Sequence, residues 1–241
     1  MRIAVMSDIH GNLEALQEVL ADMDRSAVDA RICLGDMIGY GPDPNRVLQL
    51  IDERHVPSVI GNHELGAVDS TYLNWFNPSA RNSLVASIRT IEATALASVR
   101  RLPKVIVRHG ARFVHGFPPD SPLIYAFQVS EEEIKQAFRQ TSEKICFIGH
   151  THLLEIISFD GQALTRSDLQ LGRRCLCAHK RYIINIGSVG QPRDGDNHAK
   201  YVIWDTTRRL IEVKFVAYDI AAVVKKIRAA GLPEINARRL L

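Results

Sequence analysis

The sequence is poor in cysteine, with only Cys33, Cys146, Cys175 and Cys177 among its 241 residues. Cys175 and Cys177 are separated by a single residue, which is the wrong spacing for a Cys-x-x-Cys redox or zinc pair. Cys33 and Cys146 lie inside apolar runs, where cysteine behaves as a small apolar residue. We therefore expect neither a disulfide framework nor a zinc-thiolate site.

Long apolar runs and an excess of one charge are also missing. No apolar stretch approaches the roughly 18 residues that cross a bilayer, and a strand is predicted from Arg2, where a signal peptide would begin. We expect a cytoplasmic protein with no membrane partner. The 30 basic and 27 acidic residues are spread along the chain, so the charge does not indicate nucleic acid as a partner. A homo-oligomer is compatible with the sequence.

What the sequence does contain is a set of short apolar runs that end at residues able to bind a metal. Such an ending is typical of a buried strand whose carboxyl end meets a ligand. The run Ile32-Cys33-Leu34 ends at Gly35-Asp36. Other runs end at Asp8 and His10, at Asn62-His63, at His115, at His150 and His152, and at Asn185-Ile186-Gly187-Ser188. We predict that these strand ends converge on one metal site, with Asp36 between two ions.

The motifs differ in how specifically they indicate a metal. In an extended turn, side chains two positions apart face the same way, so Asp8 and His10 can bind one ion. Alone, these two residues would be read equally well as a capping carboxylate and a surface imidazole. A histidine pair directly after an apolar strand is hard to bury without a ligand, so His150 and His152 form the most specific motif.

Asp36, Asn62 and His63 differ in the chemistry that they can supply. A carboxylate has two oxygens and can bind two cations at once, which no imidazole does. The amide oxygen of Asn62 is a neutral, hard ligand. His63 follows it directly and must point elsewhere, so it is free to face a substrate. Without the other motifs, each would be read as a polar residue of a turn.

The apolar periodicity predicts one α/β domain over residues 1–241. Helices are expected after the N-cap Asn12, from Asp43-Pro44, from Asn77-Pro78 to Pro103, after the capping box Ser130–Glu133, and after Asp219 up to Gly231. Hairpins are expected at His109-Gly110, at Asp160-Gly161 and between residues 201–204 and 210–213, and a third strand at Val59-Ile60. Residues 162–180 are expected to form a loop.

The helical segment from about 65 to 102 is expected near the site, because it directly follows Asn62-His63. Its apolar stripe is explained by packing on the core. We also hypothesise that Tyr72, Trp75, Phe76 or Arg81 lines the mouth of the site. The candidates for substrate contact are Asn12, Tyr40 and Arg81. The glycine-rich residues 187–195 either approach the site or form a structural turn.

Together the candidate ligands are nitrogen and oxygen donors without thiolate. This set suits Mn or Fe, with Zn, Co and Ni as alternatives. Two such divalent ions about 3.5 to 4 Å apart would bridge a water, lower its pKa and clamp a phosphoryl oxygen for in-line attack. The expected chemistry is hydrolysis of a phosphate ester.

The order of the motifs resembles that of the calcineurin-like metallophosphoesterases. The matching segments are Asp8-x-His10, Gly35-Asp36, Gly61-Asn62-His63-Glu64, His115-Gly116 and Gly149-His150-Thr151-His152. Small bacterial YfcE-like and protein-phosphatase-like phosphoesterases also share residues 39–44 and 187–193. Glu64 stands where many relatives carry Asp.

The resemblance implies a four-layer αββα sandwich of two stacked mixed sheets flanked by helices. It implies one ion held by Asp8, His10, Asp36 and His152, and a second held by Asp36, Asn62, His115 and His150. It also implies that His63 protonates the leaving alkoxide and steadies the phosphate.

The leading expectation for function is a phosphodiesterase or phosphomonoesterase of small substrates. A Ser/Thr-type phosphoprotein phosphatase and a dinucleoside polyphosphate hydrolase are the alternatives, because the same core serves all three. A non-catalytic scaffold of this fold would have lost ligands, whereas this chain keeps the full set and His63. A nuclease would need a basic groove or extra domains, and the sequence indicates neither.

Overall fold

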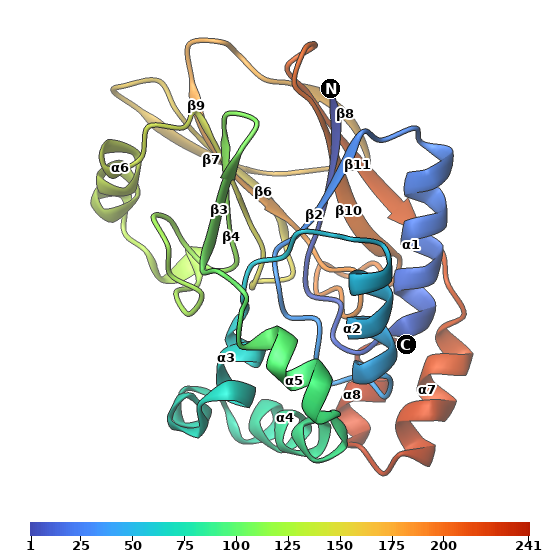
Figure 1. Cartoon of the computed structure of the whole chain (residues 1–241). Helices are drawn as coiled ribbons and strands as arrows, with labels where there is room; N and C mark the ends of the chain where they lie inside the picture. Colours follow the sequence, from blue (N-terminus) through green and yellow to red (C-terminus); the bar gives the residue numbers. More distant parts are fainter.

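The computed structural model describes residues 1–241, which form two mixed β-sheets with helices outside them (Figure 1). The first sheet has the strand order β2-β1-β10-β11-β8 and the second the order β3-β4-β5-β9-β6-β7. The first contains β1 (Arg2–Met6), β2 (Ala30–Cys33), β8 (Gly172–Cys175), β10 (Ala199–Asp205) and β11 (Leu210–Val216). The second contains β3 (Val105–Arg108), β4 (Ala111–Val114), β5 (Ile145–Ile148), β6 (Leu154–Phe159), β7 (Leu164–Asp168) and β9 (Arg181–Ile186).

Side chains along each strand point alternately to the two faces of the sheet, and each face packs against a different layer. In β1, Ile3 and Val5 pack in a cluster with Phe113 and Phe147 of the second sheet, so this cluster lies between the sheets. Ala4 and Met6 point the other way, into the cluster beneath α1 (Leu13–Arg25) and α2 (Pro44–Glu53). A third cluster joins the second sheet to α6 (Glu131–Gln140). The order helices, sheet, sheet, helix confirms the predicted αββα sandwich.

Several predicted element ends are confirmed by their caps. The Asn12 side chain accepts a hydrogen bond from the Ala15 amide at the start of α1, and Ser130 and Glu133 form the capping box of α6. Asp219 caps α7 (Ile220–Ala229). Asp43 precedes α2 as expected, but its carboxylate accepts from Lys226 Nζ at 2.8 Å instead of capping the helix.

The prediction of a third strand at Val59-Ile60 is wrong. Only Ser58 pairs with Cys33, as an isolated parallel bridge, and the Ile60 amide turns away to donate to the Pro103 carbonyl. Pro57 has no amide hydrogen to extend the pairing. The chain therefore enters α3 (Asn62–Val68) directly, so Asn62 and His63 lie in the first turn of a helix.

The single helix expected from Asn77 to Pro103 is also wrong. The chain forms the 3₁₀ turn η1 (Ser70–Trp75), then α4 (Pro78–Thr90) and α5 (Ala93–Val99). The break falls where Asn45 of α2 donates to the Thr90 carbonyl at 2.7 Å and accepts from the Glu92 amide at 2.9 Å. These bonds replace helical ones, so a contact with a distant residue ends α4.

The stretch 162–180, expected as a loop, contains two strands. β7 pairs with β6, as the predicted hairpin at Asp160-Gly161 requires, and β8 crosses to the other sheet and pairs with β11. A short 3₁₀ turn, η2 (Ala126–Gln128), precedes α6. No helix in the structure is both long enough and apolar enough to cross a membrane.

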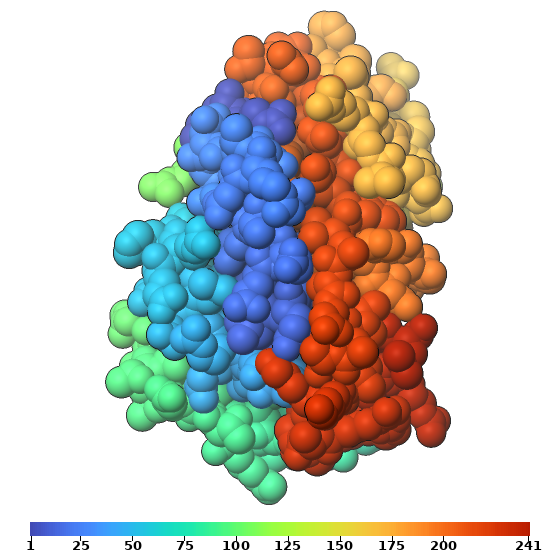
Figure 2. Space-filling view, turned by 90° about the vertical axis from the view of Figure 1, so that its right-hand side faces the viewer, coloured from blue at the N-terminus to red at the C-terminus, as the bar shows by residue number.

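The chain ends in two helices, α7 and α8 (Glu234–Arg238), of which α8 was not expected. Figure 2 shows this C-terminal segment on the surface beside helix α1. Lys226 of α7 pairs with Glu14 of α1 at 2.7 Å and with Asp43 before α2 at 2.8 Å. The end of the chain is thereby held against the first turn of α1 and the loop that follows β2.

Candidate metal centre

The loops after five strands and the start of α3 meet at one end of the two sheets. β1 and β2 run parallel in one sheet, and β4, β5 and β9 run parallel in the other, so their carboxyl ends share an edge. The candidate ligands and His63 come together there, each with less than a tenth of its surface exposed: Asp8, His10, Asp36, Asn62, His63, His115, His150 and His152. Ligand atoms lie within 4.8 Å of one another in three groups: Asp8, His10 and His152; His10, Asp36 and His63; and Asp36, His115 and His150.

The backbone at these residues is left-handed, not extended. Asp8, His10 and Asp36 have φ of 55°, 51° and 51°, and His150 and His152 have 69° and 62°. The argument from an extended turn was therefore wrong in its geometry, although both side chains of each pair do reach the same centre. A non-glycine residue in this region carries strain, and a cluster of such residues is typical of functional sites.

In the first group, backbone carbonyls decide which imidazole nitrogen faces the centre. His10 Nδ1 donates to the Ile38 carbonyl at 3.0 Å and His152 Nδ1 donates to the Gln191 carbonyl at 2.5 Å. Because a carbonyl can only accept, both Nε2 atoms carry lone pairs when the rings are neutral. These lone pairs face each other across 3.1 Å. Asp8 Oδ1, which has no hydrogen-bond partner, lies 3.3 Å from His152 Nε2.

In the second group, backbone carbonyls again orient both imidazoles, but His150 bonds to its carbonyl through Nε2 instead of Nδ1. His115 Nδ1 donates to the Leu34 carbonyl at 2.8 Å, whereas His150 uses Nε2 to reach the Leu123 carbonyl at 3.2 Å. His115 Nε2 then lies 3.1 Å from His150 Nδ1 and 3.1 Å from Asn62 Oδ1. Each group thus directs several buried donor atoms at one point, which a divalent cation would satisfy.

Asp36 lies between the two groups. Its Oδ1 accepts from the His63 amide at 2.9 Å. Its Oδ2 is 3.8 Å from His10 Nε2 and 3.3 Å from His115 Nε2, so a single oxygen faces both groups. Gly61 lies against this carboxylate, and a Cβ atom there would be 2.1 Å from Asp36 Oδ1.

The charges of the centre attract a cation. Burial by itself would raise the pKa of Asp36, but His115 and His63 hold it well below its usual range, and His152 likewise lowers the pKa of buried Asp8. Burial opposes protonation of His115, yet Asp36 raises its pKa to about 9. A proton and a metal ion therefore compete for His115 Nε2.

This proton predicts how metal affinity depends on pH. Below the pKa of about 9, a metal ion that binds at His115 must displace the proton. We expect the apparent dissociation constant for Mn²⁺ at the site that contains His115 to fall by about tenfold per pH unit between pH 6.5 and 8. Calorimetric titration in two buffers of different ionisation enthalpy measures the dissociation constant and the number of protons released on binding. Equal affinity and no proton release across this range would contradict the prediction.

Glu64, fully buried at the start of α3, holds the loop that carries Asp36. Its carboxylate accepts from the backbone amides of Asp36 at 2.7 Å, Met37 at 2.8 Å, Ile38 at 3.2 Å and Gly61 at 2.9 Å. Burial and Asp36 raise its pKa to about 7, and the amide hydrogen bonds oppose that rise. The sequence marked Glu64 only as a departure from the related pattern, because the four donors come largely from a distant loop.

Replacement of Glu64 by Gln tests this role. The side-chain NH₂ group would face amide donors, leaving at least one buried N–H unpaired at about 1 to 3 kcal/mol. We expect Glu64→Gln to lower the unfolding temperature by about 2 to 12 °C, since a chain of this size loses about 2 to 4 °C per kcal/mol. Calorimetry measures it, with Glu92→Gln on the surface as the control. An unchanged unfolding temperature would refute the anchoring role.

Of the candidates for the mouth of the site, some contact residues of the centre and others do not. The Phe76 ring contacts His63 edge-to-face at 4.9 Å, and the Tyr40 ring lies 4.7 Å from His10 and 4.9 Å from His63. Trp75 is 74 % exposed. Neither Tyr72 nor Arg81 makes a side-chain hydrogen bond or ion pair with the centre, and Arg81 is exposed on α4.

Asn12 has a structural role that differs from the expected substrate contact. Its Oδ1 caps α1 and its Nδ2 donates to the Gly190 carbonyl at 3.0 Å. It therefore ties the loop after β1 to the loop after β9, and both of its polar atoms are already hydrogen-bonded.

The loop after β9 does approach the centre, and two residues whose roles were not predicted from the sequence support it. The Gln191 carbonyl orients His152. Lys200 Nζ, buried in β10, is bound by Asp194 at 2.8 Å and by the Asp196 carbonyl at 2.6 Å. A lysine inside an apolar strand was the one signal available, and its partners could not be read from the sequence.

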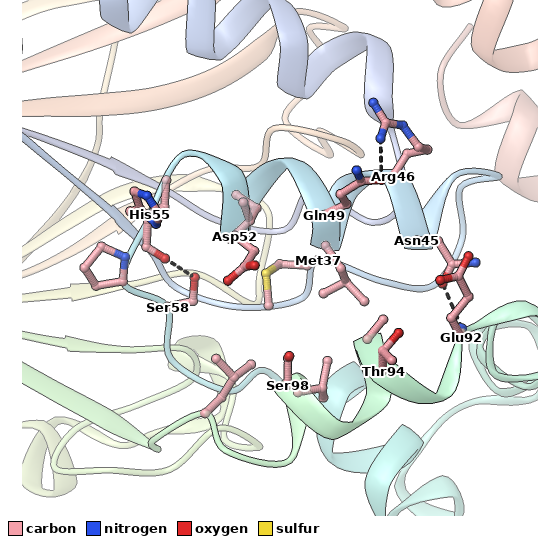
Figure 3. Close-up of a pocket in the computed structure, with 17 residues that line it drawn as sticks. Met37, Asn45, Arg46, Gln49, Asp52, His55, Ser58, Glu92, Thr94 and Ser98 are labelled. Atoms are coloured by element: carbon pink, nitrogen blue, oxygen red, sulfur yellow. Dashed lines mark hydrogen bonds between the residues drawn. The ribbon is translucent and has the colours of Figure 1, made fainter.

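A large cavity of the protein lies outside the centre. It has a volume of about 750 Å³ and is formed by α2, α5 and the segment before α3 (Figure 3). Met37 lines it and is the residue next to Asp36, but no ligand candidate does. The cavity therefore does not belong to the metal centre.

Comparison with known proteins identifies relatives along the whole chain. Residues 1–209 match the family model described as the calcineurin-like phosphoesterase superfamily domain. An uncharacterized protein of Methanocaldococcus jannaschii is 36 % identical over 241 residues, covering 99 % of this chain and 96 % of the relative. A metallophosphoesterase crystal structure from Sphaerobacter thermophilus superposes with a TM-score of 0.84 at 34 % identity, covering 100 % of this chain and 98 % of the other. A hypothetical protein from Pyrococcus horikoshii shares the fold, with a TM-score of 0.79 at 17 % identity and coverage of 99 % and 97 %.

Proposed function

Because the chain belongs to the calcineurin-like phosphoesterase superfamily, we propose that it is a dimetal phosphohydrolase that cleaves small phosphodiesters or phosphomonoesters. The observation that carries the proposal is the arrangement of two groups of buried donor atoms on either side of Asp36 Oδ2. Two divalent cations between these atoms would compensate lone pairs and carboxylate charge that otherwise face one another.

In this proposal Asp8, His10, Asp36 and His152 hold one ion, and Asp36, Asn62, His115 and His150 hold the other. The ions, when bound, supply an activated water and neutralise charge on the phosphate. The donor set favours Mn or Fe. The carbonyls of Ile38, Leu34, Leu123 and Gln191 keep the four imidazoles in the tautomer and orientation that this role requires.

His63 is proposed as the acid that protonates the leaving alkoxide. It is 2 % exposed, and Phe76 and Tyr40 pack against its ring. Burial lowers the pKa of His63 to about 4 and Asp36 opposes that shift. An anionic phosphate beside the ring acts on the pKa of His63 in the same direction as Asp36, because a negative charge favours the protonated imidazole.

The experiment that tests the function is hydrolysis by the purified protein loaded with Mn²⁺ or Fe²⁺. The substrate panel contains bis(p-nitrophenyl) phosphate, p-nitrophenyl phosphate, a cyclic nucleotide, a phosphopeptide and a dinucleoside polyphosphate. We expect metal-dependent release of product from a small diester or monoester. Preferred turnover of the phosphopeptide or the dinucleoside polyphosphate would select an alternative substrate class. Rates equal to those of metal alone on every substrate would favour a non-catalytic scaffold.

A further inference from the structure

The C-terminal segment, which follows the residues matched by the family model, packs against a loop of the metal centre. The match ends at residue 209, and α7 and α8 lie beyond it. Asn236 of α8 is 1 % exposed and donates to the Tyr40 carbonyl at 2.9 Å. Tyr40 in turn contacts His10 and His63. The end of the chain therefore forms part of the wall of the site.

Two guanidinium groups converge on this wall from distant parts of the sequence. The Cζ atom of Arg193 lies 5.9 Å from the centre of the Tyr40 ring, and that of Arg239 lies 6.0 Å from the same point. Both groups also donate to Gln191 Oε1, at 3.0 and 3.5 Å. Arg193 comes from the loop after β9 and Arg239 directly follows α8.

Neither guanidinium is neutralised by the protein. No carboxylate lies within 4.0 Å of Arg193 or Arg239, although many other arginines have one, such as Arg228, which pairs with Glu234 at 2.7 Å. Both residues are exposed at this position. Two like charges held side by side around a neutral amide oxygen and one aromatic ring repel each other. An anion between them would remove this repulsion.

The positions of the two groups are supported by buried contacts. Gln191 is 2 % exposed and its backbone amide donates to Ser188 Oγ at 2.8 Å. Lys200 fixes the residues after Arg193 through Asp194. Leu240, next to Arg239, is 3 % exposed in the cluster that joins α7 and α8. The pair is thus held in place before any ligand binds, which favours bidentate recognition of a phosphate.

We propose that Arg239, together with Arg193, binds a second phosphate group of the substrate, so that the enzyme prefers phosphoesters carrying another phosphate beyond the scissile one. This inference rests on the proposed function. One aromatic ring, Tyr40, separates the guanidinium pair from His10 and His63. The pair therefore lies at the rim of the centre, where it reaches a neighbouring group of the substrate. In this assignment Arg239 is a specificity-determining residue.

The test compares two substrates with the same type of leaving alcohol, propane-1,3-diol monophosphate and propane-1,3-diol bisphosphate, on the Mn²⁺-loaded full chain. For the wild type we expect kcat/KM to be about tenfold higher for the bisphosphate, after correction for its two equivalent esters. Arg239→Met should reduce this ratio to about twofold or less, and Arg239→Lys should restore part of it. Arg238→Met changes the exposed last residue of α8, directly before Arg239; it is the matched control and should keep the full ratio.

Calorimetric binding of the same two compounds gives a readout that does not need turnover. A binding preference for the bisphosphate that depends on Arg239 supports the second-phosphate site even if neither compound is hydrolysed. The proposed function is overturned only if the diesters of the substrate panel are not hydrolysed either. Hydrolysis of both compounds at equal efficiency by the wild type overturns the inference and leaves the function standing. An Arg239→Met variant that keeps the tenfold ratio, or that loses both activities in proportion, also overturns it, because a merely structural role affects the two substrates alike.

Discussion

Asp36→Asn is expected to weaken the binding of both ions together. Asp36 Oδ2 is the single oxygen that faces His10 and His115, one from each group of donors. The amide keeps the shape of the side chain and the bond from the His63 amide, but it removes the negative charge shared by both sites. Loss of an outer partner of a metal ligand already costs about 10 to 100-fold in affinity, so we expect a loss of more than about 100-fold at each site and hydrolysis at background level.

Metal content by elemental analysis and Mn²⁺ titration measure this result. Asp69→Asn is the control, because Asp69 caps η1 at the surface and lies outside the centre. The two groups could also bind independently, with Asp36 serving only one of them. Selective loss of one ion would demonstrate that arrangement and refute the shared position.

The second large effect is expected for His63→Gln. His63 lies within reach of the centre, since its Nε2 is 3.9 Å from Asp36 Oδ2, but its backbone amide and not its ring is bound to that carboxylate. We expect the variant to keep both ions and to lose about 10²- to 10⁴-fold in kcat, the usual contribution of a positioned acid.

The dependence on the leaving group separates an acid from a residue that only steadies the phosphate. Protonation matters most for alkoxides, which leave poorly, and least for p-nitrophenolate. The loss should therefore grow with the pKa of the leaving alcohol across a series of aryl and alkyl esters. A uniform loss across the series would assign His63 to phosphate binding alone, and loss of metal from the variant would make it a ligand. His109→Gln, in the exposed turn between β3 and β4, is the control.

Local sequence patterns were sufficient for the fold class and for many of the element ends. Short apolar runs, caps and turn pairs depend on residues close together in the chain, and these patterns predicted an α/β domain with α1, α6, α7 and the hairpins. The sandwich of two sheets was implied by the resemblance of the motif order to that of a known family. They failed where a distant residue intervened. Asn45 ends α4 by bonding to Thr90 and Glu92, and β8 leaves its neighbour β7 to pair with β11.

The types of donor were likewise determined by the sequence, because the side-chain chemistry of Asp, Asn and His is independent of the fold. Their place after strands was predicted correctly except for Asn62 and His63, which lie in the first turn of α3. The tertiary structure decided how those donors are used. His10 and His152 are 142 positions apart, and only the carbonyls of Ile38 and Gln191 direct their Nε2 atoms at each other. The roles of Glu64, Gln191 and Arg239 also arise from contacts between remote segments, which no local pattern encodes.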